Sequence, residues 1–137
     1  VIQKGGIKMK LNSDCIRDIL LTDEEECDYS HVMDYDRDVN VTTRLQKYTH
    51  DELIYHIKQC EYANLTLNTT YYDGGKHIII RDLSPNGHQF LADIREDNVW
   101  NGVKDVAKKV GSTSLSALIQ ISSNVITQII KNQFKLT

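Results

Sequence analysis

Histidines are the side chains of this sequence best suited to moving a proton or binding a transition metal. The five histidines stand at positions 31, 50, 56, 77 and 88. His50 and His56 are six residues apart, which places them on different faces of a helix, so the pair predicts no shared zinc site. The sequence contains no His-Glu-x-x-His motif, no phosphate-binding loop and no Gly-x-Ser-x-Gly elbow. We therefore expect no catalytic residues, no enzymatic activity and no cofactor.

Aspartates and cysteines could also bind a metal ion, and their spacing argues against it. Residues 34–38 read Asp-x-Asp-x-Asp, which resembles the start of a calcium loop. Such a loop needs glycine and glutamate where this chain has Val39 and Leu45. The three cysteines, Cys15, Cys27 and Cys60, match no metal pattern either. We expect buried thiols, since Cys15 and Cys60 lie among helical apolar residues, and therefore a reducing, cytoplasmic compartment.

Length and charge limit the possible partners. The 137 residues are 40% hydrophobic and 26% charged, which is typical of one globular domain. No stretch approaches the roughly 20 apolar residues that a membrane span needs, so we expect no membrane partner. Residues 14–38 hold ten acidic and two basic side chains, within a formal net charge of −3. Because a strongly basic nucleic-acid binder looks different, any contact with DNA must come from a local patch.

A helix, a β-hairpin and a second helix are predicted between residues 49 and 94, the core order of a winged-helix domain. Thr49 and Glu52 form a capping box at the start of the first helix, and Asn64 can adopt the left-handed conformation that ends it. Strands are predicted over 65–72 and 76–83, joined by a tight Asp-Gly-Gly turn. Ser-Pro at 84–85 begins the next helix.

The flanking segments are predicted to be mainly helical. Ser13 can cap a helix that runs to about Glu26, and a loop follows over residues 28–38. Residues 39–45 alternate apolar and polar side chains, as in a short strand. Two further helices follow residue 98, separated by Gly111.

Three stretches carry a resemblance to a known family: YTHDELIYHIKQCEYANL, YYDGGKHIII and RDLSPNGHQFLADIRED. They resemble small proteins of bacterial phages and prophages that are grouped as a domain of unknown function. The resemblance extends over everything from Met9 onward. Since that family has no established activity, it implies a phage genome and a bacterial host as context, and no chemistry.

A broader resemblance is to winged-helix regulators, whose recognition helix ends in an Ala-Gly-Leu-like sequence and whose wing is followed by a Leu-Thr-Pro-x-Gly-x-x-Phe-Leu-like helix start. The counterparts here are Ala-Asn-Leu at 63–65 and Leu-Ser-Pro-Asn-Gly-His-Gln-Phe-Leu at 83–91. Residues 38–48 depart from the pattern, because they show little sign of the short second helix. The resemblance implies double-stranded DNA as partner, bound through Tyr55, His56, Lys58 and Gln59 of a helix in the major groove, with Lys76, His77 and Arg81 on the wing.

The last helix suggests a second partner, another copy of the chain. Residues 111–137 contain no acidic residue, and their apolar stripe is longer than one small domain usually needs. We expect a homodimer, with intramolecular packing on the first helix as the alternative. The dimerisation residues would be Leu115, Leu118, Ile119, Val125, Ile126, Ile129 and Ile130.

These observations predict an α+β, winged-helix-like domain over residues 9–97 and a helical dimerisation extension over 98–137. Residues 1–8 resemble a translated ribosome-binding site before Met9, so we expect an upstream extension or a tail there. The leading hypothesis is a non-catalytic DNA-binding protein that regulates phage genes. The alternative is a protein-binding adaptor or host-factor inhibitor that uses the acidic N-terminal region.

Overall fold

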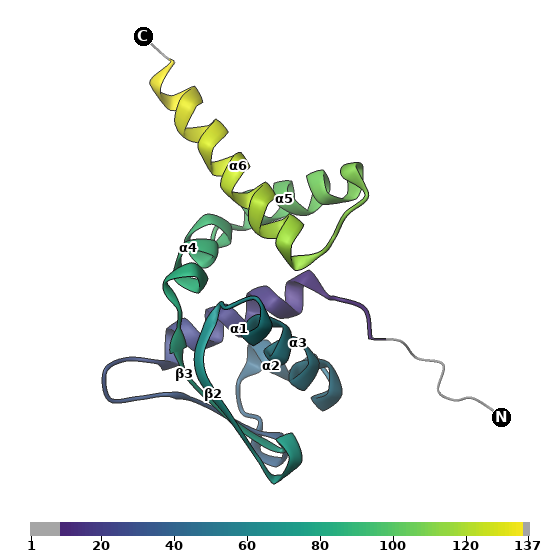
Figure 1. Ribbon diagram of the computed structural model, residues 1–137, viewed down its shortest axis with the longest axis vertical. Coiled ribbons are helices and arrows are strands. Elements are labelled where there is room, and N and C mark those ends of the chain that lie inside the picture. The colour runs from purple at the N-terminus through teal and green to yellow at the C-terminus, as the bar shows by residue number, and fades with distance from the viewer. Residues whose placement is uncertain (1–8, 136–137) are drawn as a thin grey trace, which may run out of the picture.

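The computed structural model describes residues 9–135, which form six α-helices and one three-stranded antiparallel sheet (Figure 1). The expected extension over residues 1–8 lies outside the described residues. In chain order the elements are α1 (Ser13–Glu26), β1 (Met33–Asp36), the 3₁₀ turn η1 (Arg37–Val39), α2 (Thr43–Gln46), α3 (His50–Tyr62), β2 (Thr66–Tyr72), the 3₁₀ turn η2 (Asp73–Gly75), β3 (His77–Leu83), α4 (Pro85–Ile94), α5 (Asp97–Val110) and α6 (Leu115–Phe134).

Local capping explains where most of these helices begin and end. Thr49 accepts a hydrogen bond from the Glu52 amide at 3.1 Å, and the Glu52 carboxylate accepts one from the Thr49 amide at 2.9 Å, which confirms the capping box. Asn64, just beyond α3, has φ 60°, as predicted. Ser84 caps α4 with proline at its first position. At α1 the prediction was one residue late, because Asn12 is the cap.

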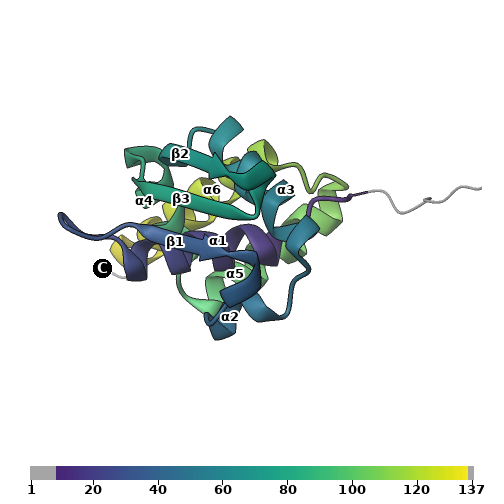
Figure 2. The same ribbon diagram turned by 90° about the horizontal axis from the view of Figure 1, so that it is seen from below.

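The sheet has the order β1-β3-β2, which Figure 2 shows from below. Strand β1 lies within the predicted loop 28–38 and pairs Met33 with Ile80 and Tyr35 with Ile78. The strand predicted over residues 39–45 was wrong, since this segment holds the end of η1 and the start of α2. The alternation there is misleading, because Val39 and Val41 are 64% and 77% exposed.

Helix α2 is the short helix that the pattern of residues 38–48 did not predict. It has only four residues, too few for an apolar period to be visible in the sequence. Leu45 is its one buried residue, and the amide of Leu45 bonds to the Thr42 carbonyl at 3.0 Å. Leu45 therefore anchors this turn of helix in the core shortly before α3, and Arg44 of the same turn donates hydrogen bonds to Thr22 and Glu25 of α1.

The core is built around α1, which packs against α2, α3, α4 and β3. Its buried residues include Cys15 and Ile19, and α3 contributes Cys60 to the same cluster. Burial raises the pKa of the Cys15 thiol to about 12, so this sulfur is a thiol and behaves as a small apolar group. The predicted burial of Cys15 and Cys60 is confirmed, whereas Cys27 is half-buried.

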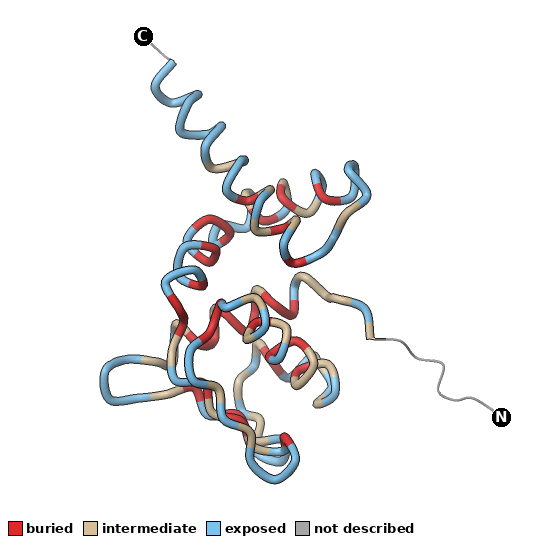
Figure 3. Tube along the Cα trace, in the orientation of Figure 1, coloured by how far each residue is buried: buried red, intermediate tan, exposed pale blue. Residues whose placement is uncertain are grey.

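Helices α5 and α6 complete this core on one side, and the C-terminal half of α6 extends beyond it. Trp100, Val103 and Ala107 of α5 are buried in the same cluster as α1 and α4. Gly111, with φ 74°, ends α5 in the left-handed conformation that a residue with a Cβ rarely adopts. Figures 1 and 3 show that α6 then starts against the other helices and projects away from them, with its C-terminal half exposed. None of the helices within residues 9–135 is long and apolar enough to cross a membrane.

Candidate nucleic-acid interface

Helix α3 and the β2–β3 hairpin hold six of the seven residues expected to contact DNA in exposed or half-buried positions. The capping box fixes the first turn of α3, and three apolar side chains hold the helix on the core: Leu53, Ile57 and Cys60. Its opposite face is therefore left to solvent.

His56 is the exception, and its predicted place on the exposed face was wrong. The side chain is fully buried, between the stripe of α3 and the start of α1. Its Nε2 accepts a hydrogen bond from the Asn12 amide at 2.8 Å, and its Nδ1 lies 2.7 Å from the Glu52 carbonyl oxygen, to which it donates. His56 lies three residues after Leu53 and beside Ile57, so helical spacing puts it on the buried stripe. It provides the acceptor for the Asn12 backbone amide and cannot reach a DNA base.

The exposed face of α3 combines polar and aromatic side chains. Tyr55 and Gln59 are half-buried, Lys58 is exposed, and Tyr62 is 72% exposed. Tyr62 was not among the predicted contact residues. The signal that would have found it is its position seven residues after Tyr55, because such residues share a helical face.

Lys58 also links α3 to the hairpin. Its Nζ lies 5.0 Å from the centroid of the Tyr71 ring on β2. The Tyr71 hydroxyl donates a hydrogen bond of 2.8 Å to Glu61, and burial, reinforced by this bond, raises the pKa of the phenol. Tyr71 thus lies between a cation and a carboxylate of α3, and it orients the Lys58 ammonium group toward the hairpin.

The hairpin tip, residues 73–76, packs against α3. Gly75 is buried with φ 96°, and a Cβ at this position would collide with the side chain of Ile54. Lys58 lines the same hollow as Ile54, Gly74 and Gly75. The tip therefore lies beside the exposed face of α3, so the expected helical and wing residues Lys58 and Lys76 belong to one surface.

Strand β1 brings a further cation to the tip. The Arg37 amide donates to the Lys76 carbonyl at 2.8 Å, and the Arg37 side chain, 41% exposed, bonds to Asp38 at 3.0 Å. Lys76 itself is exposed. Sequence reasoning missed Arg37 because only the pairing of β1 with β3 places it beside the tip.

His77 and Arg81, both on β3, lie in different surroundings. His77 is one-third exposed and is 2.6 Å from Asp34 of β1, with the Tyr72 ring beside it. Arg81 is exposed near the other end of the hairpin, where it lines a hollow with Tyr29 and His88. The structure therefore brings Lys58, Lys76 and His77 to the tip end and leaves Arg81 at the opposite end.

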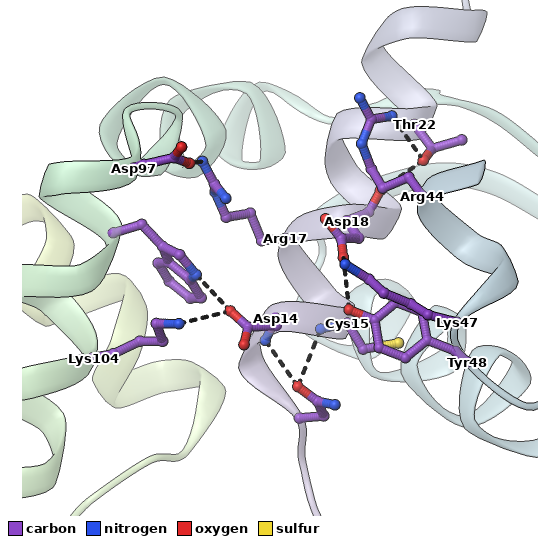
Figure 4. A network of polar contacts seen from close by, with 12 residues as sticks. Asp14, Cys15, Arg17, Asp18, Thr22, Arg44, Lys47, Tyr48, Asp97 and Lys104 are labelled. Carbon is purple, nitrogen blue, oxygen red and sulfur yellow. Dashed lines mark hydrogen bonds and ion pairs between the residues drawn. The ribbon is translucent and has the colours of Figure 1, made fainter. Parts of the chain in front are cut away.

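Carboxylates of α1 are engaged within the fold (Figure 4). Asp14 accepts hydrogen bonds from the Trp100 indole at 2.8 Å and from Lys104 at 2.9 Å. Asp18 lies 3.1 Å from the Lys47 ammonium group and accepts a hydrogen bond from the Tyr48 hydroxyl at 2.6 Å. These contacts tie α1 to α5 and to the segment before α3, so these two carboxylates of the acidic segment hold helices together.

The chemistry open to this surface is binding by cations, amides and aromatic rings. Within residues 9–135, no three histidine, cysteine or acidic side chains lie close enough to hold a metal ion. Asp36 and Asp38, from the calcium-like sequence, bond to the Asp38 amide and to Arg37 instead. Lysine and glutamine at the surface fit contacts with phosphate oxygens and base edges.

The described residues define an α+β protein with a small three-stranded antiparallel sheet, and comparison with known proteins identifies its family. The family described as "Hypothetical protein (DUF2513)" matches residues 10–114. A relative from Haemophilus influenzae, described as an uncharacterized protein, is 31% identical over 124 residues, which cover 89% of this chain and 99% of the relative. No solved structure matches the chain. The chain belongs to the DUF2513 family, which confirms the expected membership of a family of unknown function.

Proposed function

We propose that this chain is a non-catalytic, winged-helix-like DNA-binding protein of the bacterial cytoplasm that regulates phage or prophage genes. Helix α3 would enter the major groove, and the β2–β3 hairpin would act as the wing. The observation that carries the proposal is the placement of the hairpin tip beside the exposed face of α3, where Ile54 and Gly75 are in contact range. The short α2 before α3 also supplies the helix that the winged-helix resemblance called for.

Each residue of this surface has a role that follows from its chemistry. Gln59 can form the paired hydrogen bonds that recognise adenine. Lys58 and Lys76 provide charge for phosphates, with Arg37 beside them. Tyr62 offers an exposed aromatic ring at the end of α3.

The acidic start of α3 limits how the helix meets DNA. Asp51 is exposed in the first turn, and Glu52 is occupied by the capping box. A carboxylate close to a phosphate is repelled, so the helix would approach with its C-terminal half, which carries Lys58 and Tyr62. Two or three phosphate contacts then give a slope of roughly −2 to −3 for log K against log salt, from about −0.9 per contact.

Electrophoretic or fluorescence titration across a salt series tests the proposal. The probe is duplex DNA from the region upstream of the chain's own gene, with a random duplex of equal length for comparison. Lys58→Ala and Lys76→Ala should each reduce the magnitude of the salt slope by about 0.9. Lys109→Ala, which removes the same charge from an exposed position on α5, is the matched control and should keep the slope. No binding of either duplex at low salt would refute the proposal.

A second candidate function is a protein-binding adaptor or inhibitor of a host factor. The observation that favours it is the loop after α1, in which Tyr29 is 98% exposed next to Asp28. Exposed aromatic rings are enriched in the contacts between proteins. Two results together would favour this role: no DNA binding at low salt, and a host protein that binds the wild-type chain but not the Tyr29→Ala variant.

A further inference from the structure

Helix α6 has two halves with different surroundings. In the first half, Leu118 and Ser122 are buried where the helix packs on α4 and α5. In the second half, Ile129, Ile130 and Phe134 are 40%, 50% and 78% exposed. Figure 3 shows this change from buried to exposed along the helix. The two expected dimerisation residues Leu115 and Leu118 therefore belong to the chain's own core, and their predicted place in a dimer contact was wrong.

The exposed apolar residues continue the face that the first half buries. Ile119 is packed against the core, and Ile126 lies seven residues further on, hence on the same face. Ile130 lies eleven residues after Ile119 and so stays on that side. Ile129 lies eleven residues after the buried Leu118 and seven after the buried Ser122. Phe134, four residues after Ile130, lies at the edge of this face. About two and a half turns of partly apolar helix surface, residues 126–134, thus extend past the elements that cover the first half of α6.

A groove opens beside this face at the base of the helix. It has a volume of about 440 Å³ and lies between α4 and α6, next to the start of β2. Phe90 and Ile119 are among its apolar lining residues, and Gln89, Asp93 and Ser123 among its polar ones. Helix α6 therefore forms one wall of the groove and also carries the uncovered apolar face.

We propose that a second copy of this chain covers both features, with two α6 helices crossing antiparallel around a two-fold axis. In such a pair centred on Ile126, residue 119 of one copy lies opposite residue 133 of the other, because each is seven residues from the crossing. The exposed Ile130 and Phe134 of each copy then lie over the groove of its partner. Each copy contributes the same apolar face and the same groove, so the two contacts are equivalent. The dimer is therefore closed and needs no third chain.

Charge favours the same occupant. Among the described residues that line the groove, Asp93 is the one acidic residue; it is 8% exposed, and its carboxylate accepts a hydrogen bond from the Gln89 amide at 3.2 Å. Residues 111–137 contain no acidic side chain, and their charged residues are Lys131 and Lys135. The helix that enters the groove therefore brings no negative charge toward Asp93, and its net charge has the opposite sign.

Light scattering of the full chain, coupled to size-exclusion chromatography at micromolar concentration, tests this pairing. The wild-type protein should show twice the chain mass of 15.7 kDa. Ile130→Asp, on the exposed face, and Ser123→Arg, in the groove, should each halve the observed mass. Gln128→Asp adds the same charge as Ile130→Asp to an exposed position on another side of α6 and should leave the mass doubled. Circular dichroism and thermal unfolding confirm that each variant is folded.

The two variants together test reciprocity. In an equimolar mixture, the apolar face of the Ser123→Arg chain meets the unchanged groove of the Ile130→Asp chain, so one of two contacts is restored and some doubled mass should return. A wild-type monomer would overturn the second copy as the occupant. A doubled mass that persists in both variants would place any dimer elsewhere, and loss of mass in Ile130→Asp alone would overturn docking in the groove. These outcomes do not depend on whether the chain binds DNA.

Discussion

Replacing Asp23 by asparagine should change how the stability of this protein depends on pH. Asp23 is fully buried near the C-terminal end of α1. Its Oδ1 accepts a hydrogen bond from the Cys27 thiol at 2.7 Å, while its Oδ2 has no partner among the described residues. Burial raises the pKa of Asp23 from 3.8 to about 7; the Cys27 hydrogen bond opposes this shift, and Asp82 and Glu26 add to it.

The direction of the effect follows from where the proton is bound. Between pH 3.8 and about 7, folded Asp23 keeps a proton that the unfolded chain has released. The free energy of unfolding therefore falls as the pH rises through this window, and the stabilisation is lost above it. About three pKa units at about 1.36 kcal/mol each give roughly 4 kcal/mol, of which roughly 3 kcal/mol falls between pH 5 and 7. Asparagine keeps the size and the acceptor for Cys27 but does not titrate.

Urea denaturation at pH 5 and pH 8 measures this effect. The free energy of unfolding of Asp23→Asn minus that of wild type should rise by roughly 3 kcal/mol from pH 5 to pH 8, because only the wild type loses stability over this range. Asp105→Asn, at an exposed position on α5, is the control and should follow the wild-type profile. Parallel pH profiles for wild type and Asp23→Asn would show that the buried carboxyl does not titrate in this range and would refute the reasoning.

Two further substitutions test how α4 and α1 are positioned. Gly87→Ala should destabilise the fold by about 1–3 kcal/mol, because the new Cβ would collide with the Leu65 carbonyl oxygen, and an unchanged Tm would contradict this. His56→Leu should cost about 1–3 kcal/mol in chemical denaturation, because the Asn12 amide loses its acceptor. His56→Gln keeps an acceptor and should lose less; equal losses would argue against the hydrogen bond.

The sequence alone determined the elements whose signals are local. The capping box of Thr49 and Glu52, the left-handed Asn64 and the Ser-Pro start of α4 were all predicted, because each depends on residues a few positions apart. The β2–β3 hairpin was predicted for the same reason, since a tight turn joins two strands of suitable residues. The helix, hairpin and helix of residues 49–94 were therefore visible before any tertiary contact was known.

Tertiary structure alone decided which of these residues share a surface. The β1 strand and the single turn of α2 are too short to show a period, and they exist because Tyr35 meets Ile78 and Leu45 enters the core. Packing against α1 buried His56, and the contact of Gly75 with Ile54 placed the hairpin tip beside α3. Packing on α4 and α5 likewise divided the continuous apolar stripe of α6 into a covered half and an exposed half. A helical period tells which side chains lie on one face, but only the neighbouring elements determine how much of that face is covered.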